Sequence, residues 1–70
     1  MKYVGIKQVL KAAKSGEIKK VFIGKDAERR VTEALIKVCK ERRIEIVYIK
    51  TMAELGKLAG IEVEAAVAAE

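Results

Sequence analysis

Three lysines near the N-terminus recur at a spacing that places them on one face of a helix. Lys7, Lys11 and Lys14 are separated by four and three residues, and Gln8 lies beside them. A row of ammonium groups contacts phosphates without reading bases, whereas a side-chain amide, with donors and an acceptor, can read a base edge. Gly5, just before the row, lets a backbone approach closely, and N–H groups at a helix start favour an anion. The pattern predicts phosphate contact with base recognition; the alternative is a solvated charged face.

The amino-acid composition argues against most classes of enzyme and of metal-binding protein. The chain has 70 residues, with no His, no Pro and a single Cys. Zinc sites and neutral-pH general bases need His or several Cys, and one thiol cannot form an internal disulfide. We therefore expect a non-catalytic protein without metal or cofactor, folded as a single domain over residues 1–70. Cys39 is expected to be a small core residue.

The excess of positive charge is confined to the N-terminal part of the chain. Residues 1–30 carry nine cationic and three anionic side chains, whereas residues 31–70 carry six and seven, which accounts for the net charge of +5. A one-sided positive field favours a polyanionic partner, with nucleic acid ahead of an acidic protein or a membrane surface. Simple solubility is the alternative. No apolar run approaches the ~20 residues that span a bilayer, and the first residues lack a signal-peptide pattern, so we expect a monomeric cytoplasmic protein without membrane contact.

Hydrophobic periodicity predicts alternating strands and helices. The expected elements are a brief strand at 3–4, a helix over 5–15, a strand over 20–24, a helix from an Asp26 cap to about 43, a strand over 44–49, a helix from a Thr51 cap to Gly60, and a last strand over 65–69. The consecutive apolar residues of the middle strands indicate burial on both faces. The fold class is therefore α/β, a three-layer α/β/α sandwich around a small mixed sheet in the order βαβαβαβ.

The same periodicity predicts which helical residues face the core. In the long helix the expected inward residues are Val31, Ala34, Leu35, Val38 and Cys39, and in the last helix they are Met52, Leu55, Leu58 and Ala59. Gly56 interrupts that last helix at a cost of about 1 kcal/mol relative to Ala. Close packing, or proximity to a ligand, would explain it.

Three segments together resemble a known family. They are the run Gly5-Ile6-Lys7-Gln8-Val9-Leu10-Lys11-Ala12, the strand and turn over 21–27, and Leu55-Gly56-Lys57-Leu58-Ala59-Gly60-Ile61-Glu62-Val63. In this order they resemble the ribosomal-protein superfamily that binds RNA kink-turns, and within it the short bacterial YbxF-like branch. The resemblance covers essentially the whole chain. It implies an α/β/α sandwich and a non-catalytic protein that binds structured RNA, ribosomal or regulatory, in its kinked form.

The resemblance also implies a two-part RNA site. Lys7 and Gln8 stand where the archaeal branch has Asn-Glu, and Lys11 matches a family lysine, so these side chains would face tandem sheared G·A pairs. The second part is the loop before the last strand, with Ile61, Glu62, Val63, Glu64 and Ala65. Its apolar members resemble those that pack on a flipped-out nucleotide. The alternative for Ile61 and Val63 is simple entry into a core strand.

Two features separate this chain from the family pattern. It lacks the proline-containing turn after Asp26, so helix entry would depend on Asp26 as a cap, and Gln8 replaces the archaeal glutamate. A second function class also remains open. The same fold can serve as a protein-interaction or ribosome-associated assembly module, in which case the basic face would meet an acidic partner.

Overall fold

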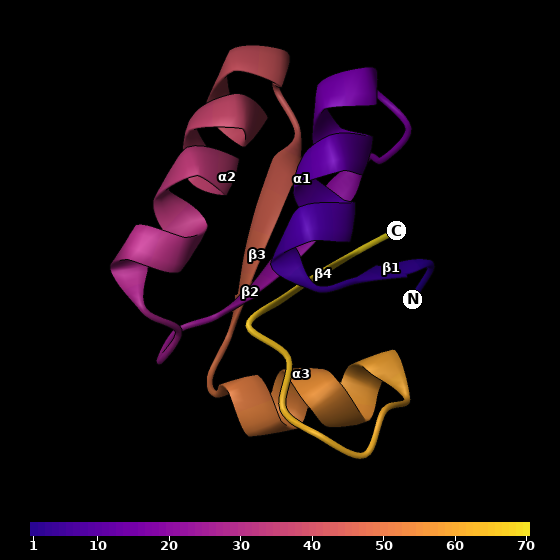
Figure 1. Ribbon diagram of the computed structural model, residues 1–70, viewed down its shortest axis with the longest axis vertical. Helices are drawn as coiled ribbons and strands as arrows, with labels where there is room; N and C mark the ends of the chain where they lie inside the picture. The colour runs from indigo at the N-terminus through magenta and orange to yellow at the C-terminus, as the bar shows by residue number, and fades with distance from the viewer.

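The computed structural model describes residues 1–70. It contains four strands and three helices (Figure 1). They are β1 (Tyr3–Val4), α1 (Ile6–Ser15), β2 (Lys20–Gly24), α2 (Arg29–Arg42), β3 (Glu45–Ile49), α3 (Met52–Ala59) and β4 (Val67–Ala69). The predicted βαβαβαβ order is confirmed. None of the helices combines the length and the apolar character that crossing a membrane requires.

The four strands form one mixed sheet in the order β1-β4-β2-β3. β2 and β3 are parallel, with Ile23 opposite Tyr48, whereas β4 is antiparallel to both of its neighbours, β1 and β2. The last strand therefore lies inside the sheet, and β3 forms one edge. Parallel strands need a crossover between them, and α2 provides it.

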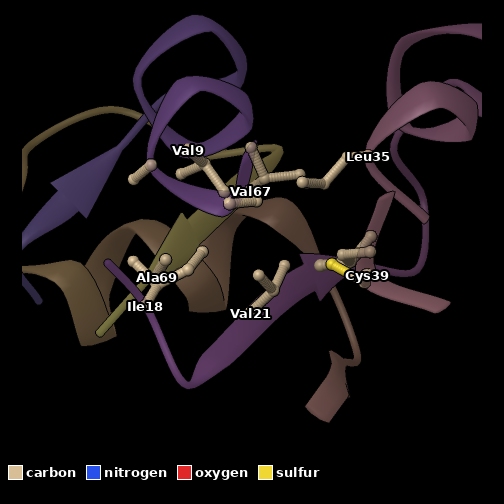
Figure 2. Packing of buried hydrophobic residues seen from close by; sticks show 10 residues of the cluster. Val9, Ile18, Val21, Leu35, Cys39, Val67 and Ala69 are labelled. Atoms are coloured by element: carbon tan, nitrogen blue, oxygen red, sulfur yellow. The ribbon is translucent and has the colours of Figure 1, made fainter. Parts of the chain in front are cut away.

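Helices cover both faces of the sheet, which confirms the three-layer sandwich. α1 and α2 lie side by side on one face and α3 lies on the other (Figure 1). Alternation along β2 follows from the strand period of two: Val21 and Ile23 join the cluster under α1 and α2, whereas Phe22 packs on the α3 side. Figure 2 shows the larger cluster, whose buried members are Val9, Ala12, Ala13, Ile18, Val21, Ile23, Leu35, Cys39, Val67 and Ala69.

The start and the buried face of α2 differ from the prediction. α2 begins at Arg29 with Glu28 as its N-cap residue, so the prediction that Asp26 caps this helix is wrong. The buried stripe contains Thr32 as well as Leu35 and Cys39, while Val31 is 37% exposed. Ala34 is also exposed, because the face of α2 that packs on the core is rotated from the one that the apolar pattern indicated.

α3 has the predicted cap and a partly wrong inward face. The hydroxyl of Thr51 accepts a hydrogen bond from the amide of Glu54 at 3.0 Å, and Gly60 ends the helix in the left-handed conformation. Leu55 is fully buried, but Leu58, predicted to face inward, is 58% exposed. With eight residues, α3 covers the sheet with one narrow stripe, and Leu58 falls outside it.

β3 is less covered than its apolar run predicted. None of its residues is fully buried: Ile46, Val47 and Ile49 are half-buried, and Tyr48 is 50% exposed. Burial on both faces holds for β2, which is an inner strand, and fails for β3 because an edge strand has a neighbour on one side only.

Candidate nucleic-acid interface

The polar residues predicted on the first helix share its solvent face. Lys7, Gln8, Lys11 and Lys14 are all exposed, whereas Val9, Ala12 and Ala13 of the same helix are buried. The only ion pair in the structure joins Arg30 to Glu28, so none of these lysines is neutralised by a carboxylate. α1 therefore presents an uncompensated row of ammonium groups with an amide beside it.

The N-terminal end of α1 is open to an anion. Gly5, the N-cap residue, has φ 100°, a conformation that glycine adopts without strain, and it supplies no side-chain cap. The first turn contains no acidic residue. The first N–H groups of a helix have no partner within it and carry a partial positive charge, so this end attracts negative charge.

A shallow hollow lies beside this polar face. It has a volume of about 300 Å³ and is lined by Tyr3, Gln8, Lys11, Ala12 and Glu17. The Tyr3 hydroxyl donates a long hydrogen bond of 3.4 Å to the carboxylate of Glu17. The amide of Gln8 makes no hydrogen bond to the protein, so both its carbonyl and its amino group are available to a ligand.

The loop between α3 and β4 is held by backbone contacts, and the side chains in its middle are exposed. Glu62 and Glu64 are exposed, and Val63 is 70% exposed. Ile61 is half-buried against the small cluster around Leu55. β4 begins only at Val67, so neither Ile61 nor Val63 enters a strand. Ile61 is a partly buried loop residue, and Val63 is an exposed one.

Gly56 allows this loop to lie directly on α3. A Cβ added at Gly56 would overlap the carbonyl oxygen of Val63 and crowd the Cα of Glu64. The close packing that the sequence suggested for Gly56 is therefore observed, and its partner is the backbone of the predicted second contact.

Backbone hydrogen bonds connect the two parts of the predicted site. The amide of Gly5 donates to the carbonyl of Val67 at 3.1 Å, so the start of α1 lies against the residue that follows the loop. Figure 1 shows the loop returning from α3 to the start of β4 beside this end of α1. The amide of Gly24 donates to the carbonyl of Ala66 at 2.9 Å, and that of Ala65 to the carbonyl of Met52 at 3.0 Å. The start of α1, the end of β2, the start of α3 and the loop thus form one connected unit.

The positions of Ala65 and Asp26 in the fold were not predicted from the sequence. Ala65 is buried, with 4% exposure, and it anchors the loop through its amide and its packing. Asp26 accepts a hydrogen bond from the amide of Met52 at 2.7 Å, and so stabilises the start of α3. No local pattern signals this contact, because the partners are 26 positions apart in the chain.

Cys39 is buried in the core, as predicted. Burial raises the pKa of its thiol above the ordinary value, because the thiolate would be poorly solvated there. A protonated, inaccessible thiol is unreactive, so Cys39 contributes packing and no chemistry.

Comparison with known proteins places this geometry in a family. The family model for the ribosomal protein L7Ae/L30e/S12e/Gadd45 family matches residues 3–70. An RNA-binding protein of Caldanaerobacter subterraneus subsp. tengcongensis is 49% identical over 67 residues, covering 96% of this chain and 82% of that protein. The RNA-binding protein YbxF of Geobacillus stearothermophilus is 32% identical over 66 residues, covering 94% and 80%.

Solved structures show the same fold. The Giardia lamblia 15.5kD RNA binding protein has a TM-score of 0.87 at 25% identity, over 94% of this chain and 56% of that one. A protein from Bacillus halodurans C, described as having unknown function, has a TM-score of 0.85 at 26% identity, over 94% and 66%. This chain thus spans less than two thirds of those two larger chains. The family match and the two RNA-binding relatives show that the chain belongs to the ribosomal protein L7Ae/L30e/S12e/Gadd45 family.

Proposed function

We propose that this protein is a non-catalytic RNA-binding protein that recognises kink-turn RNA and stabilises its bent form. RNA as the partner class is supported by the family and by relatives that are themselves named RNA-binding proteins. The observation that carries the finer proposal is the exposed face of α1. Lys7, Gln8 and Lys11 are exposed on α1 and free of protein partners. The N-cap residue of this helix, Gly5, is hydrogen-bonded to Val67, the residue that follows the loop over 61–66.

The residue types on α1 fit sheared G·A pairs. The Hoogsteen edge of guanine presents the acceptors N7 and O6, to which the ammonium groups of Lys7 and Lys11 can donate. The carbonyl of Gln8 can accept from a base N–H group, and its amino group can donate in turn. Gly5 leaves room for the RNA backbone at the helix start, and Lys14, further along α1, is placed for a phosphate.

The loop supplies the second contact in this proposal. Val63, largely exposed, and Ile61, half-buried beside it, offer a branched apolar surface on which an unstacked base can pack. Glu62 and Glu64 flank Val63 and can accept from exocyclic amino groups, while Ala65 anchors the loop from beneath. Only the kinked RNA brings sheared pairs and a flipped nucleotide together, so binding at both parts selects that state.

The test compares two RNAs that differ only in the proposed recognition feature. A kink-turn RNA and a version in which Watson–Crick pairs replace the G·A pairs are titrated at two salt concentrations. We expect the kink-turn to bind more tightly at both. Gln8→Ala should cost ~1–3 kcal/mol on the kink-turn and narrow the difference between the RNAs.

Three results would contradict this proposal. Equal affinity of the wild-type protein for both RNAs would leave general polyanion binding alone. Undiminished discrimination by a folded Gln8→Ala variant would remove α1 from base recognition. Tight binding that disappears equally for both RNAs at the higher salt would point to an electrostatic surface without base contacts.

A further inference from the structure

We propose that a second surface, between α2 and β3, binds single-stranded RNA, with a base stacked on Tyr48 and phosphates held by Lys25, Arg29 and Lys40. These four residues line a hollow of about 400 Å³, the largest in the structure. Its volume falls in the range of small ligand sites, roughly 300–1,000 Å³. None of the four belongs to the α1 face or the loop over 61–66, so this proposal does not rest on kink-turn recognition.

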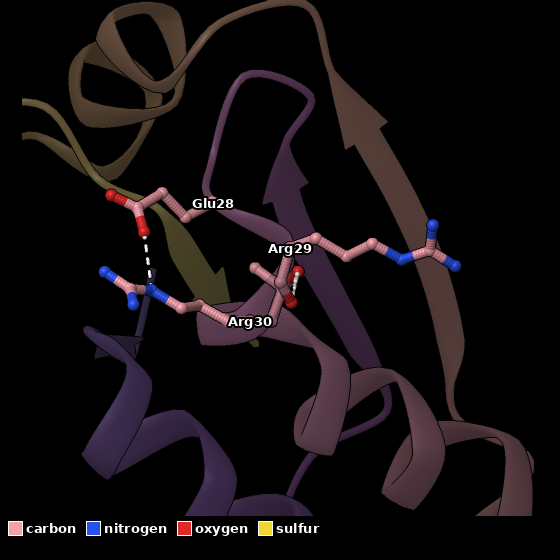
Figure 3. Close-up of polar contacts among 4 residues, drawn as sticks. Glu28, Arg29 and Arg30 are labelled. Carbon is pink, nitrogen blue, oxygen red and sulfur yellow. Dashed lines mark hydrogen bonds and ion pairs between the residues drawn. The ribbon is translucent and has the colours of Figure 1, made fainter.

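The cations of this surface have no protein partners. Arg29 and Arg30 are neighbours in sequence, but their side chains diverge, as Figure 3 shows: Arg30 turns to Glu28, and Arg29 extends to the opposite side. The Arg30–Glu28 pair, at 2.9 Å, is the only ion pair of the chain, so Lys25, Arg29 and Lys40 remain uncompensated. Unpaired cations that border one concave surface favour a ligand with several negative charges.

The positive surface continues along α2. A neighbouring hollow of about 300 Å³ is lined by Arg29, Glu33, Ile36, Lys37 and Lys40. It adds one lysine and one carboxylate, so cations outnumber anions over the two hollows together. An extended surface of this kind suits a chain of phosphates better than a single anion.

Tyr48 gives this surface an aromatic face. It lies on the edge strand β3, its side chain is half exposed, and its hydroxyl has no protein partner. Ile23, opposite Tyr48 on β2, and Ile36 of α2 contribute apolar atoms to the same hollow. Bases stack on such rings in single-stranded complexes, whatever their sequence. An acidic peptide would use the cations but would leave the exposed ring without a partner, which is why the combination favours RNA.

The start of α2 reinforces the positive side of the hollow. No side chain caps this helix, because the carboxylate of Glu28 accepts from the Nε of Arg30 instead. The first turn contains no acidic residue, and Arg29, the first residue of the helix, lines the hollow. Free N–H groups at a helix start add to the attraction for phosphate.

A fluorescein-labelled oligouridylate of ten nucleotides tests this surface, because it cannot form a kink-turn. Its binding to the full chain is followed by fluorescence anisotropy. Arg29→Glu should weaken binding at least about five-fold, and Tyr48→Ser should do the same, as expected for the loss of a stacking contact. Tyr48→Phe retains the ring and should bind like the wild type. Thermal unfolding of each variant shows that it is folded.

Matched controls separate this surface from general attraction. Arg30→Glu makes the same charge change one residue away and should weaken binding less than two-fold. Lys57→Ala removes an exposed lysine of α3, on the other face of the sheet, and should have no effect on the oligouridylate. Equal losses for Arg29→Glu and Arg30→Glu would overturn the proposal, as would unchanged binding by Tyr48→Ser. Displacement of the RNA by oligoglutamate as effectively as by unlabelled oligouridylate would identify the surface as a protein-docking site instead. Kink-turn binding can fail or succeed independently of all these outcomes.

Discussion

The carboxylate of Asp26 and the amide of Met52, far apart in the chain, lie 2.7 Å apart in the fold. Asp26 belongs to the turn after β2, and Met52 is the first residue of α3. The carbonyl of Met52 in turn accepts from the amide of Ala65 in the loop before β4. One residue of α3 therefore holds both the turn and the loop, and the position of the proposed second RNA contact depends on it.

Removing the Asp26 carboxylate should destabilise the fold through α3. Asp26→Ala leaves the Met52 amide without its acceptor, and we expect a loss of about 1 kcal/mol in the free energy of unfolding, the size of the loss when a side-chain acceptor is removed from a helix N-cap. Asp26→Asn retains an acceptor oxygen and should lose only a few tenths of a kcal/mol. Urea denaturation measures both. If Asp26→Asn lost more unfolding free energy than Asp26→Ala, the hydrogen bond to Met52 would be unimportant for stability.

Adding a methyl group at Gly56 should displace the loop and weaken RNA binding. The new Cβ of Gly56→Ala would overlap the carbonyl of Val63, so the loop must move, and we expect a stability loss on the order of 1–3 kcal/mol. Ala53→Gly is the matched control. It lies on the exposed side of the same helix and should lose about 1 kcal/mol by helix propensity alone.

Comparison of these two α3 variants distinguishes loop position from stability. Their affinities for the kink-turn RNA are measured at low temperature, where thermal unfolding curves verify that both variants are folded. Only Gly56→Ala should bind more weakly. If Ala53→Gly lost as much affinity as Gly56→Ala, the effect would belong to α3 stability and not to the position of the loop.

Val63 and Ile61 should respond differently to polar substitution. Val63 is 70% exposed, so Val63→Ser should leave the unfolding free energy within about 0.5 kcal/mol and still weaken kink-turn binding. Ile61→Ser should reduce both, because Ile61 also packs against the cluster around Leu55. Calorimetry measures the stability of both variants, and titration with the kink-turn RNA measures their affinity. Unchanged affinity of Val63→Ser would remove its side chain from the RNA contact.

Lys14 should contribute charge without base discrimination. Loss of one phosphate contact lowers the slope of log affinity against log salt by about 0.7 to 0.9. Lys14→Ala should therefore reduce this slope while the ratio of affinities for kink-turn and Watson–Crick RNA stays constant. Gln8→Ala should do the reverse. A change in the ratio for Lys14→Ala would assign Lys14 to base contact.

The sequence predicted the elements and layers because local patterns encode them. The strand runs, the Thr51 cap and the terminating Gly60 are all signals within a few residues, and each is confirmed. The predictions that were wrong concern features that depend on tertiary contacts. Asp26 has the residue type of a local helix cap but serves a helix 26 positions away, and Tyr48 follows a buried-strand pattern on a strand that the topology leaves at the edge.

The part of the candidate site that lies on α1 could be predicted from the sequence. Helical spacing placed Lys7, Gln8 and Lys11 on one face, and the structure shows them there. The hydrogen bonds that join Gly5 to Val67 and Gly24 to Ala66 connect residues far apart in the chain, so no local pattern could indicate them. The hollow at Tyr48 was missed for the same reason, since α2 and β3 form it jointly.

The buried thiol of Cys39 should make stability fall in alkaline solution. Its pKa in the folded protein is raised above the ordinary 9.0, so as the pH rises the thiol ionises first in the unfolded chain. The unfolded state then binds fewer protons than the folded state, and the free energy of unfolding decreases with pH. The contribution is fully present below about pH 9 and is lost as the pH rises from there toward the folded pKa. Urea denaturation with reductant at pH 7 to 10.5 isolates this effect by comparison with Cys39→Ala, which lacks the thiol. The stability advantage of the wild type over the variant should shrink above pH 9, and a constant difference across the range would contradict the assignment.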